Sequence, residues 1–254
     1  MQPLPEKLQD FRYFLILTWR HLNLPDPTPV QLEIAEYLQH GPRRKIIQAF
    51  RGVGKSWITS AYVVWKLRID PQLKFLVVSA SKDRADNFST FTMRLITEMD
   101  ILAPLRPDGN QRNSKISFDV RPSRADHAPS VKSVGVLGQM AGSRADEVVA
   151  DDVEVPNNSF TQPMRDKLSE AVKEFDAILK PKGMITFLGT PQTEQSLYNT
   201  LEERGYTTCI WPARYPPLRN NYGDRLAPKL HQRLLDELVK PKDPVDPERF
   251  SSID

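Results

Sequence analysis

Short runs of β-branched and aromatic residues alternate along the chain with longer segments in which apolar residues recur every three or four positions. The first pattern is typical of a buried strand and the second of an amphipathic helix. Their alternation predicts an α/β fold with a mostly parallel sheet flanked by helices. The expected strands are residues 45–50, 73–81, 131–137, 147–153, 184–189 and 207–211. The expected helices are residues 4–22, 30–39, 55–67, 83–99 and 164–179.

Regular patterning fades over residues 101–132, where Pro, Asn, Ser and Arg are frequent. One alternating stretch, residues 115–121, predicts a single strand there. We expect this segment to form an excursion outside the main sheet. Near the end of the chain, residues 241–247 read PKDPVDP. Prolines and charges at this density are typical of a linker.

Composition limits the class of protein. With 254 residues, of which 39% are hydrophobic, the chain can bury a sizeable core, and this excludes a disordered chain. The 35 Lys and Arg residues against 32 Asp and Glu residues give a net charge of only +3, so any polyanion must be bound by a local surface. No apolar run approaches the roughly 18 residues needed to cross a bilayer, and the N-terminus lacks the basic start of a signal peptide. We therefore expect a cytosolic protein that makes no membrane contact.

A glycine-rich turn lies between the first expected strand and the helix that follows it. Residues 49–56 read AFRGVGKS, which matches the phosphate-binding pattern G-x-x-x-x-G-K-[ST] except that Ala49 replaces the first glycine. Gly52 and Gly54, with Val53 between them, allow backbone N–H groups to turn towards phosphate oxygens. A short pattern can match such a turn by chance, but the strand before it and the helix after it are the context that the motif requires.

Two polar side chains complete this motif. Lys55 is expected to reach the β- and γ-phosphates of a nucleotide, and Ser56 is expected to hold Mg²⁺. The N-terminus of the following helix adds a dipole that favours phosphate. The motif therefore predicts an ATP site with Mg²⁺ as its cofactor.

A second motif, VVADDVE at residues 148–154, ends another apolar run with acidic side chains. Asp151 is expected to hold the metal, while a second carboxylate orients the attacking water. Asp152 and Glu154 are both candidates for that second role, because they share one face if the strand continues, whereas Asp151 points away. The distance between the two motifs, with at least one strand between them, is typical of the RecA-like (ASCE) subclass of P-loop NTPases.

With these motifs in place, residues 25–215 resemble the ATPase half of a tailed-phage terminase large subunit, most closely that of the T7-like branch. The resemblance implies a motor domain that hydrolyses ATP to drive double-stranded DNA into a procapsid. It implies that Gln31, in PTPVQ, reads adenine, since an amide both donates and accepts hydrogen bonds. It also favours Asp152 as the catalytic carboxylate, while helicase-like DExD spacing keeps Glu154 open.

The same resemblance indicates two arginines that could neutralise charge on the transferring phosphoryl group. Arg51 stands inside the phosphate loop, where terminases often carry an arginine. Arg144, in AGSRAD, is similar to a stretch that in some relatives supplies an arginine finger to the neighbouring subunit. The choice between Arg51 and Arg144 stays open at this point. Thr190, in LGTP, resembles the threonine of the coupling motif, which senses the phosphate.

The excursion at residues 101–132 is the candidate surface for DNA. It holds six basic and three acidic side chains, a local charge of +3 (six minus three). A motor that moves along any sequence should contact phosphates rather than base edges. A solvated loop that only keeps the protein soluble would have the same composition. The candidate contacts are Arg112, Lys115, Arg121 and Arg124.

We expect residues 1–240 to form one ATPase motor domain, with a helical lead-in at 1–30 and the P-loop core at 45–215. Residues 241–254 are expected to be a linker towards the nuclease domain that terminase large subunits normally carry, so no nuclease activity is expected from this chain. The resemblance implies double-stranded DNA, the portal protein and the small terminase subunit as partners. It also implies a homo-oligomeric ring, docked on the procapsid in the host cytoplasm, with a monomer in isolation as the alternative.

Two other functions fit part of the pattern. A superfamily 2 helicase or translocase fragment would share the two nucleotide motifs, but its second RecA-like domain and its arginine-rich motif are missing. A nucleotide-gated assembly protein would bind ATP in order to dock on a partner, with little turnover. The paired acidic residues argue against the second alternative.

Overall fold

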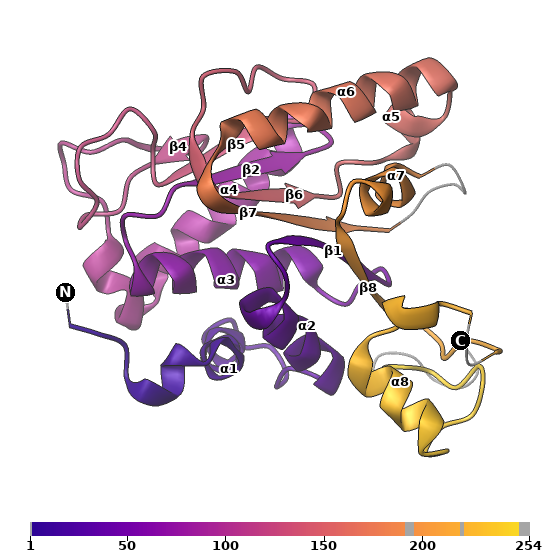
Figure 1. The fold of residues 1–254 in the computed structure, drawn as a ribbon. Helices are drawn as coiled ribbons and strands as arrows, with labels where there is room; N and C mark the ends of the chain where they lie inside the picture. The colour runs from indigo at the N-terminus through magenta and orange to yellow at the C-terminus, as the bar shows by residue number, and fades with distance from the viewer. Residues whose placement is uncertain (1, 191–195, 219–220, 249–254) are drawn as a thin grey trace.

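The computed structural model describes residues 2–190, 196–218 and 221–248, and a twisted sheet runs through its centre (Figure 1). Eight strands of the described residues lie in the order β3-β4-β5-β2-β6-β7-β1-β8. The strands from β5 to β8 in this order pair in parallel, while β3 and β4 form an antiparallel hairpin beside β5. The predicted α/β fold with a mostly parallel sheet is therefore confirmed. The strands are β1 Arg44–Ala49, β2 Phe75–Ser79, β3 Asn113–Ser114, β4 Ser117–Phe118, β5 Val131–Gly135, β6 Ala145–Asp151, β7 Leu179–Gly189 and β8 Thr207–Trp211.

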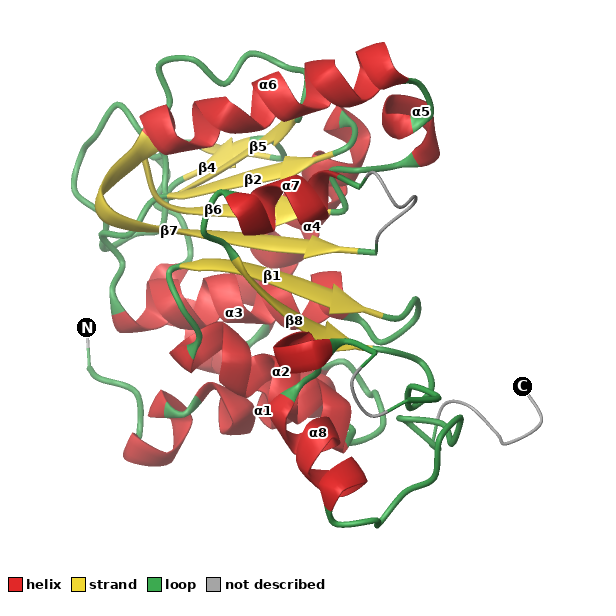
Figure 2. Ribbon diagram, turned by 45° about the vertical axis from the view of Figure 1, so that its right-hand side comes forward, coloured by secondary structure: helices red, strands yellow, loops and turns green. Residues whose placement is uncertain are grey.

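Helices cover both faces of the sheet, with α1 to α4 on one side and α6 and α7 on the other (Figure 2). None of the helices in the described part of the chain is long and apolar enough to span a membrane. The α-helices are α1 Phe11–His21, α2 Pro29–His40, α3 Lys55–Ile69, α4 Lys82–Glu98, α5 Pro156–Ser159, α6 Gln162–Ile178, α7 Leu197–Glu203 and α8 Pro228–Leu235. The 3₁₀ helices are η1 Glu6–Gln9, η2 Asp100–Leu105 and η3 Gly223–Arg225.

Alternate residues of the central strands fill two hydrophobic cores, one on each face of the sheet. In β1, Ile47 packs into the core under α1 to α4, while Ile46 packs into the core under α6 and α7. Val77 and Val78 of β2 divide in the same way. Successive side chains of a strand point to opposite faces, so a strand buried on both faces appears in the sequence as a continuous apolar run.

The order of the strands brings the two nucleotide motifs together. The parallel strands all end at the same edge, and β7 lies between β1, which precedes the phosphate loop, and β6, which carries the acidic motif. The strands that lie between these motifs in sequence, β2 to β5, are all on the far side of β6. The strand inserted between them in the sheet is therefore β7, which leads to Thr190.

The excursion at residues 101–132 differs from its prediction, because it joins the main sheet. The single strand expected at residues 115–121 is a hairpin of two short strands, and β4 pairs with β5 at the edge of the sheet. The Ser114 hydroxyl donates to the Ser117 carbonyl at 2.9 Å across the turn. Phe118 of β4 is fully buried. The burial of this aromatic ring holds the segment against the sheet.

The expected helix at residues 4–22 is divided into η1 and α1. Asp10 is extended and caps α1, because its side chain accepts a hydrogen bond from the Arg12 backbone N–H. An N-cap residue has non-helical backbone angles. A helix therefore starts afresh at Phe11 instead of running through from residue 4.

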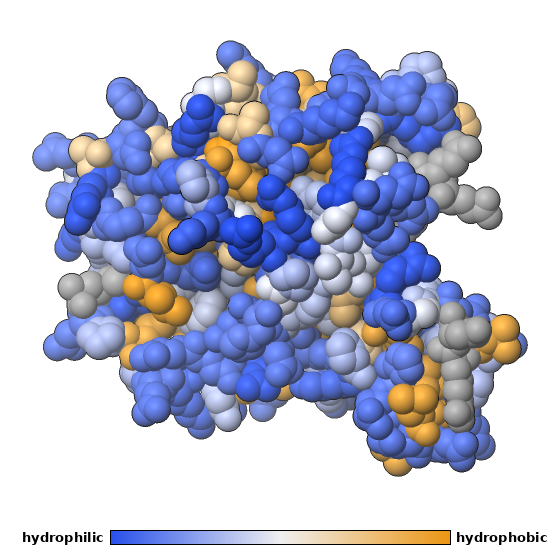
Figure 3. All heavy atoms as spheres, viewed as in Figure 1, coloured by the Kyte–Doolittle hydropathy of each residue, from blue (hydrophilic) through white to orange (hydrophobic). Residues whose placement is uncertain are grey.

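Residues 212–218 and 221–248 form a small unit beyond β8 that carries α8 (Figure 1). The segment expected to be a linker is packed against this unit over residues 241–248: the Val245 N–H donates to the Ala213 carbonyl at 2.9 Å, and the Val245 side chain is buried. Figure 3 shows apolar side chains gathered on this unit. Its exposed large apolar residues are Leu218, Leu235 and Leu238. Residues 249–254 of the expected linker lie outside the described residues.

Candidate active site

The phosphate loop joins the end of β1 to the start of α3. Gly52 and Gly54 both have φ of +86°, a left-handed conformation that side chains disfavour. Gly54 is also the N-cap of α3, so the first turn of this helix opens onto the loop. Helix N-termini carry backbone N–H groups without intrahelical partners, which suit them to bind anions. The conformation fits the phosphate-binding motif predicted from the sequence.

Lys55 lies inside this loop and contacts the end of β7. Its Nζ donates to the Ala49 carbonyl at 2.8 Å and approaches the Thr190 Oγ1 at 3.5 Å. The Thr190 hydroxyl donates to the same Ala49 carbonyl at 3.2 Å. Burial lowers the pKa of Lys55, and the Asp152 and Asp151 carboxylates oppose that shift. Lys55 and Thr190, far apart in sequence, are thus neighbours, whereas Pro191 of the same motif lies outside the described residues.

Ser56 and Asp151 meet beside the loop. The Ser56 hydroxyl donates to Asp151 Oδ1 at 3.0 Å. Mg²⁺ prefers oxygen ligands and takes few from protein, so this hydroxyl and this carboxylate are a fitting pair to hold Mg²⁺ bound to nucleotide phosphates. The described residues contain no group of three or more His, Cys, Asp or Glu side chains that could hold a metal without such a ligand.

Asp151 is at the end of β6 and is almost completely buried. Burial raises the pKa of Asp151 to about 6, and the charge of Asp152 adds to the rise. The Ser56 hydroxyl and the Lys55 ammonium act in the opposite direction. A carboxylate held above its ordinary pKa of 3.8 destabilises the folded protein until a cation reaches it.

The pKa of Asp151 predicts a specific dependence of stability on pH in the absence of metal and nucleotide. The folded state holds the Asp151 proton up to about pH 6 and the unfolded state loses it near 3.8, so the free energy of unfolding falls as pH rises between these values, by about 3 kcal/mol. Asp151→Asn should remove this loss and raise the melting temperature at pH 7.5 by about 5–10 °C. The measurement is thermal unfolding in EDTA at pH 4.5 and 7.5. Equal melting temperatures for wild type and variant at pH 7.5 would contradict the prediction.

Asp152 follows directly but does not continue the strand. It has φ of +45°, and its N–H donates to the Leu188 carbonyl at 2.9 Å. The sequence-based argument that Asp152 and Glu154 share one strand face therefore does not apply, because β6 ends at Asp151. The Asp152 side chain lines a cavity of about 540 Å³ together with the phosphate loop, and a second cavity of about 620 Å³ beside it. It stands at the boundary of the two cavities.

Glu154 is engaged elsewhere. Its Oε2 accepts hydrogen bonds from the Ser196 hydroxyl at 2.9 Å and from the Leu197 N–H at 2.6 Å, and its side chain is only 2% exposed. It thus holds the N-terminus of α7, where a negative charge is favourable. Both candidate carboxylates line the second cavity, but of the two only Asp152 also lines the cavity that holds the phosphate loop.

Gln31 lies at the base of the same cavity and is 1% exposed. Its Nε2 donates to the Val53 carbonyl at 2.8 Å, and its Oε1 accepts from the Thr28 N–H at 3.1 Å. The amide thus supports the phosphate loop and caps α2, in addition to any contact with a base. Trp19, Leu24 and Pro25 line the same cavity and offer apolar surface to a base.

The two candidate arginines lie at opposite ends of the sheet. Arg51 is exposed and lines both cavities. Arg144 directly precedes β6, seven residues before Asp151, a strand length of about 20 Å. Its Nη1 donates to the Ala177 carbonyl at 2.8 Å in the last turn of α6, where a cation is favourable. Only Arg51 can therefore reach the nucleotide site of its own chain.

Arg84 belongs to this site and was not among the predicted residues. It is in the first turn of α4, lines the second cavity with Arg51 and Thr190, and lowers the pKa of Asp151 slightly through its charge. Its position directly after a buried strand is the signal that could have identified it, since loops after parallel strands converge at this edge.

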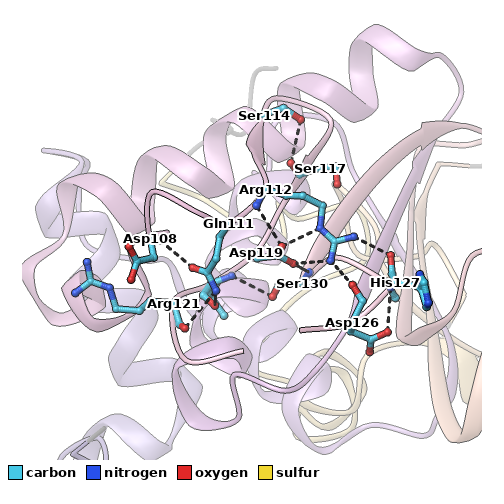
Figure 4. A network of polar contacts seen from close by, with 12 residues as sticks. Asp108, Gln111, Arg112, Ser114, Ser117, Asp119, Arg121, Asp126, His127 and Ser130 are labelled. Carbon is cyan, nitrogen blue, oxygen red and sulfur yellow. Dashed lines mark hydrogen bonds and ion pairs between the residues drawn. The ribbon is translucent and has the colours of Figure 1, made fainter. Parts of the chain in front are cut away.

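The candidate DNA contacts differ in how free their side chains are (Figure 4). Arg112 forms an ion pair with Asp119 at 2.8 Å and donates to the carbonyls of Asp126 at 2.6 Å and His127 at 2.7 Å. Its guanidinium therefore holds the excursion together, and its contact with DNA stays a prediction. The remaining candidates, Lys115, Arg121 and Arg124, are exposed.

Comparison with known proteins places these motifs in a family. The chain is 53% identical to the large terminase subunit of Enterobacteria phage T3, in an alignment that covers 96% of this chain and 43% of that protein. By sequence, this chain is homologous to part of a terminase large subunit. It thus spans less than half the length of this relative. No protein-family model matches the sequence.

Solved structures show a likeness at the level of the fold. The terminase homologue superposes on a DEAD-box helicase bound to single-stranded RNA with a TM-score of 0.51 and 14% identity, over 79% of this chain and 42% of the helicase chain. At this identity, the likeness shows a shared fold and says nothing about activity. The large terminase ATPase domain of Thermus phage P74-26 is 19% identical with a TM-score of 0.43, over 76% of this chain and 71% of that chain.

Proposed function

We propose that this chain is the ATP-hydrolysing motor part of a viral DNA-packaging terminase, which drives double-stranded DNA into a procapsid. The observation that carries the proposal is the Ser56–Asp151 hydrogen bond of 3.0 Å beside the phosphate loop, in a chain 53% identical to a terminase large subunit. A hydroxyl and a carboxylate meet there at the end of the sheet. This is the arrangement that Mg²⁺ and a nucleoside triphosphate require.

Each residue of the site has a task in this reaction. The loop from Gly52 to Lys55 binds the phosphates, and Ser56 and Asp151 hold the Mg²⁺ that neutralises them. Asp152 accepts a hydrogen bond from the attacking water and orients it, and Arg51 offsets the charge that develops on the γ-phosphoryl group. Thr190 contacts Lys55 and ends β7, so it can transmit loss of the γ-phosphate into the sheet.

Other partners follow from the same proposal. We infer a ring of identical subunits during packaging, with the portal protein and the small terminase subunit as protein partners, on the procapsid in the host cytoplasm. A helicase fragment shares the fold but has no observation of its own in its favour. A nucleotide-gated assembly protein would bind Mg-ATP equally well and release little phosphate with or without DNA.

Nucleotide binding is tested by thermal stability. Mg-ATP at about 100 times its dissociation constant should stabilise the protein by about 2.7 kcal/mol. Lys55→Ala should abolish that gain, because the ammonium that meets the phosphates is gone. Lys167→Ala, on the exposed face of α6, is the matched control and should keep the full gain. If Mg-ATP stabilises neither wild type nor control, the proposed function is wrong.

DNA contact is tested by salt dependence. The exposed side chains Lys115, Arg121 and Arg124 are proposed to meet phosphates, so replacing all three with Ala should reduce the slope of log K against log salt by about 0.9 for each phosphate that is no longer neutralised. The measurement is binding of duplex DNA with nucleotide present. The control replaces two exposed lysines of α6, Lys167 and Lys173, with Ala, so that it also removes positive charge but from another surface. An unchanged slope for the triple variant would place the DNA on another surface.

A further inference from the structure

Asp246 is a buried carboxylate on the segment that leaves the P-loop core. It is 1% exposed, and its Oδ2 accepts a hydrogen bond from the Thr28 hydroxyl at 2.9 Å, although 218 residues separate the two in sequence. Burial of a carboxylate is costly unless donors meet it. The packing of Val245 beside it keeps the segment in this place.

Thr28 connects this carboxylate to the nucleotide site. It is the N-cap of α2 and shares a reciprocal capping box with Gln31, whose Oε1 accepts from the Thr28 N–H. The Gln31 Nε2 in turn donates to the Val53 carbonyl at 2.8 Å, between the two left-handed glycines of the phosphate loop. Asp246, Thr28, Gln31 and Val53 therefore form one buried chain of hydrogen bonds.

A second set of hydrogen bonds connects α2 to the small unit beyond β8. Glu33 accepts hydrogen bonds from the Lys229 N–H at 2.9 Å and from the Trp211 Nε1 at 3.1 Å. It thus joins α2 to the first turn of α8 and to the end of β8. A displacement of this unit would therefore shift α2. The side chain of Gln31, which holds the phosphate loop, would move with the helix.

We propose that Asp246 is a positioning residue for nucleotide binding, which acts through Thr28 and Gln31 on the conformation of the phosphate loop. The inference rests on the proposed function, because it concerns affinity for ATP. It makes the position of residues 241–248 a control on that affinity, because moving this segment away would release Thr28 and loosen the phosphate loop. Glu248, two residues on, lines the nucleotide cavity itself.

Loss of this hydrogen bond should weaken ATP binding without slowing the chemical step. Without this acceptor, the Thr28 hydroxyl loses its partner and holds less firmly the capping box that positions Gln31 against the loop. Asp246→Ala should therefore raise the dissociation constant and the KM for ATP about tenfold, which equals about 1.4 kcal/mol. The kcat should stay within twofold, because loop contacts to the phosphates are shared by substrate and transition state.

The test compares Asp246→Ala with four further variants of the whole chain. Asp246→Asn keeps an oxygen that accepts from Thr28 and should have near-normal affinity. Thr28→Val also removes the cap on the Gln31 N–H, so it should cause at least the tenfold loss. Adding Asp246→Ala to Thr28→Val should cause no further loss of ATP affinity, because both residues belong to the same chain of hydrogen bonds. Asp224→Ala, an exposed acid of the same unit, is the control.

The outcomes separate this inference from the proposed function. If Asp246→Ala lowers the melting temperature but leaves the ATP dissociation constant and KM unchanged, the residue only anchors the segment and the inference is overturned. If Asp246→Ala does not fold, Thr28→Val decides the question in the same way. If wild type itself fails to bind ATP, the proposed function fails first.

Discussion

Asp152→Asn is expected to reduce ATP hydrolysis by about 10²–10⁴, the usual contribution of a positioned general base. The reason is geometric: Asp152 leaves the strand with φ of +45° and lines both the nucleotide cavity and the neighbouring one. The affinity for Mg-ATP should change little, because Ser56 and Asp151, and not Asp152, are the proposed metal ligands. Phosphate release at saturating Mg-ATP measures the rate, and nucleotide-induced stabilisation measures the binding.

Glu154→Gln is the matched control for this substitution. Glu154 holds the Ser196 hydroxyl and the Leu197 N–H at the start of α7, and a glutamine oxygen can accept both bonds. We expect hydrolysis within a few-fold of wild type and a small loss of stability from the missing charge at the helix N-terminus. Inactive Glu154→Gln combined with active Asp152→Asn would reverse the assignment.

The part of the site that the sequence predicts is the part built from neighbouring residues. The phosphate loop is short, and its conformation depends on Gly52, Gly54 and the start of α3, all within one motif. The strands and most helices of the core were recognisable for a similar reason, since a strand buried on both faces is a continuous apolar run. The acidic motif was recognisable because its charges end such a run.

The rest depends on contacts between distant segments, which local patterns do not record. The capping role of Glu154 requires α7, which begins 43 residues later. The ion pair and hydrogen bonds of Arg112 require Asp119, Asp126 and His127 to lie around its guanidinium. The packing of residues 241–248 could not be predicted from the sequence, because a proline-rich composition indicates a linker whether or not tertiary contacts hold the segment in place. Short helices such as α8, at eight residues, carry too few turns for a periodic signal.

Arg51→Ala is expected to lower hydrolysis by about 10³–10⁵, the range for an arginine that stabilises phosphoryl transfer. Arg51 lines both cavities of its own site, whereas Arg144 is bound to the end of α6 at the opposite end of β6. We therefore expect Arg144→Ala to hydrolyse ATP normally and the specific activity of wild type to be independent of protein concentration. Arg43→Ala, an exposed arginine before β1, is the control.

Mixing two inactive variants distinguishes an arginine acting in its own chain from one supplied by a neighbour. Lys55→Ala retains both arginines but cannot bind the phosphates, while Arg51→Ala binds them but lacks the charge. If Arg51 acts in its own site, no mixture of the two regains activity at any concentration. If activity instead rises with concentration, is lost in Arg144→Ala and is regained when Arg144→Ala is mixed with Lys55→Ala, the neighbouring subunit supplies Arg144. The cation at the γ-phosphate would then arrive only on assembly, and ring formation itself would switch hydrolysis on.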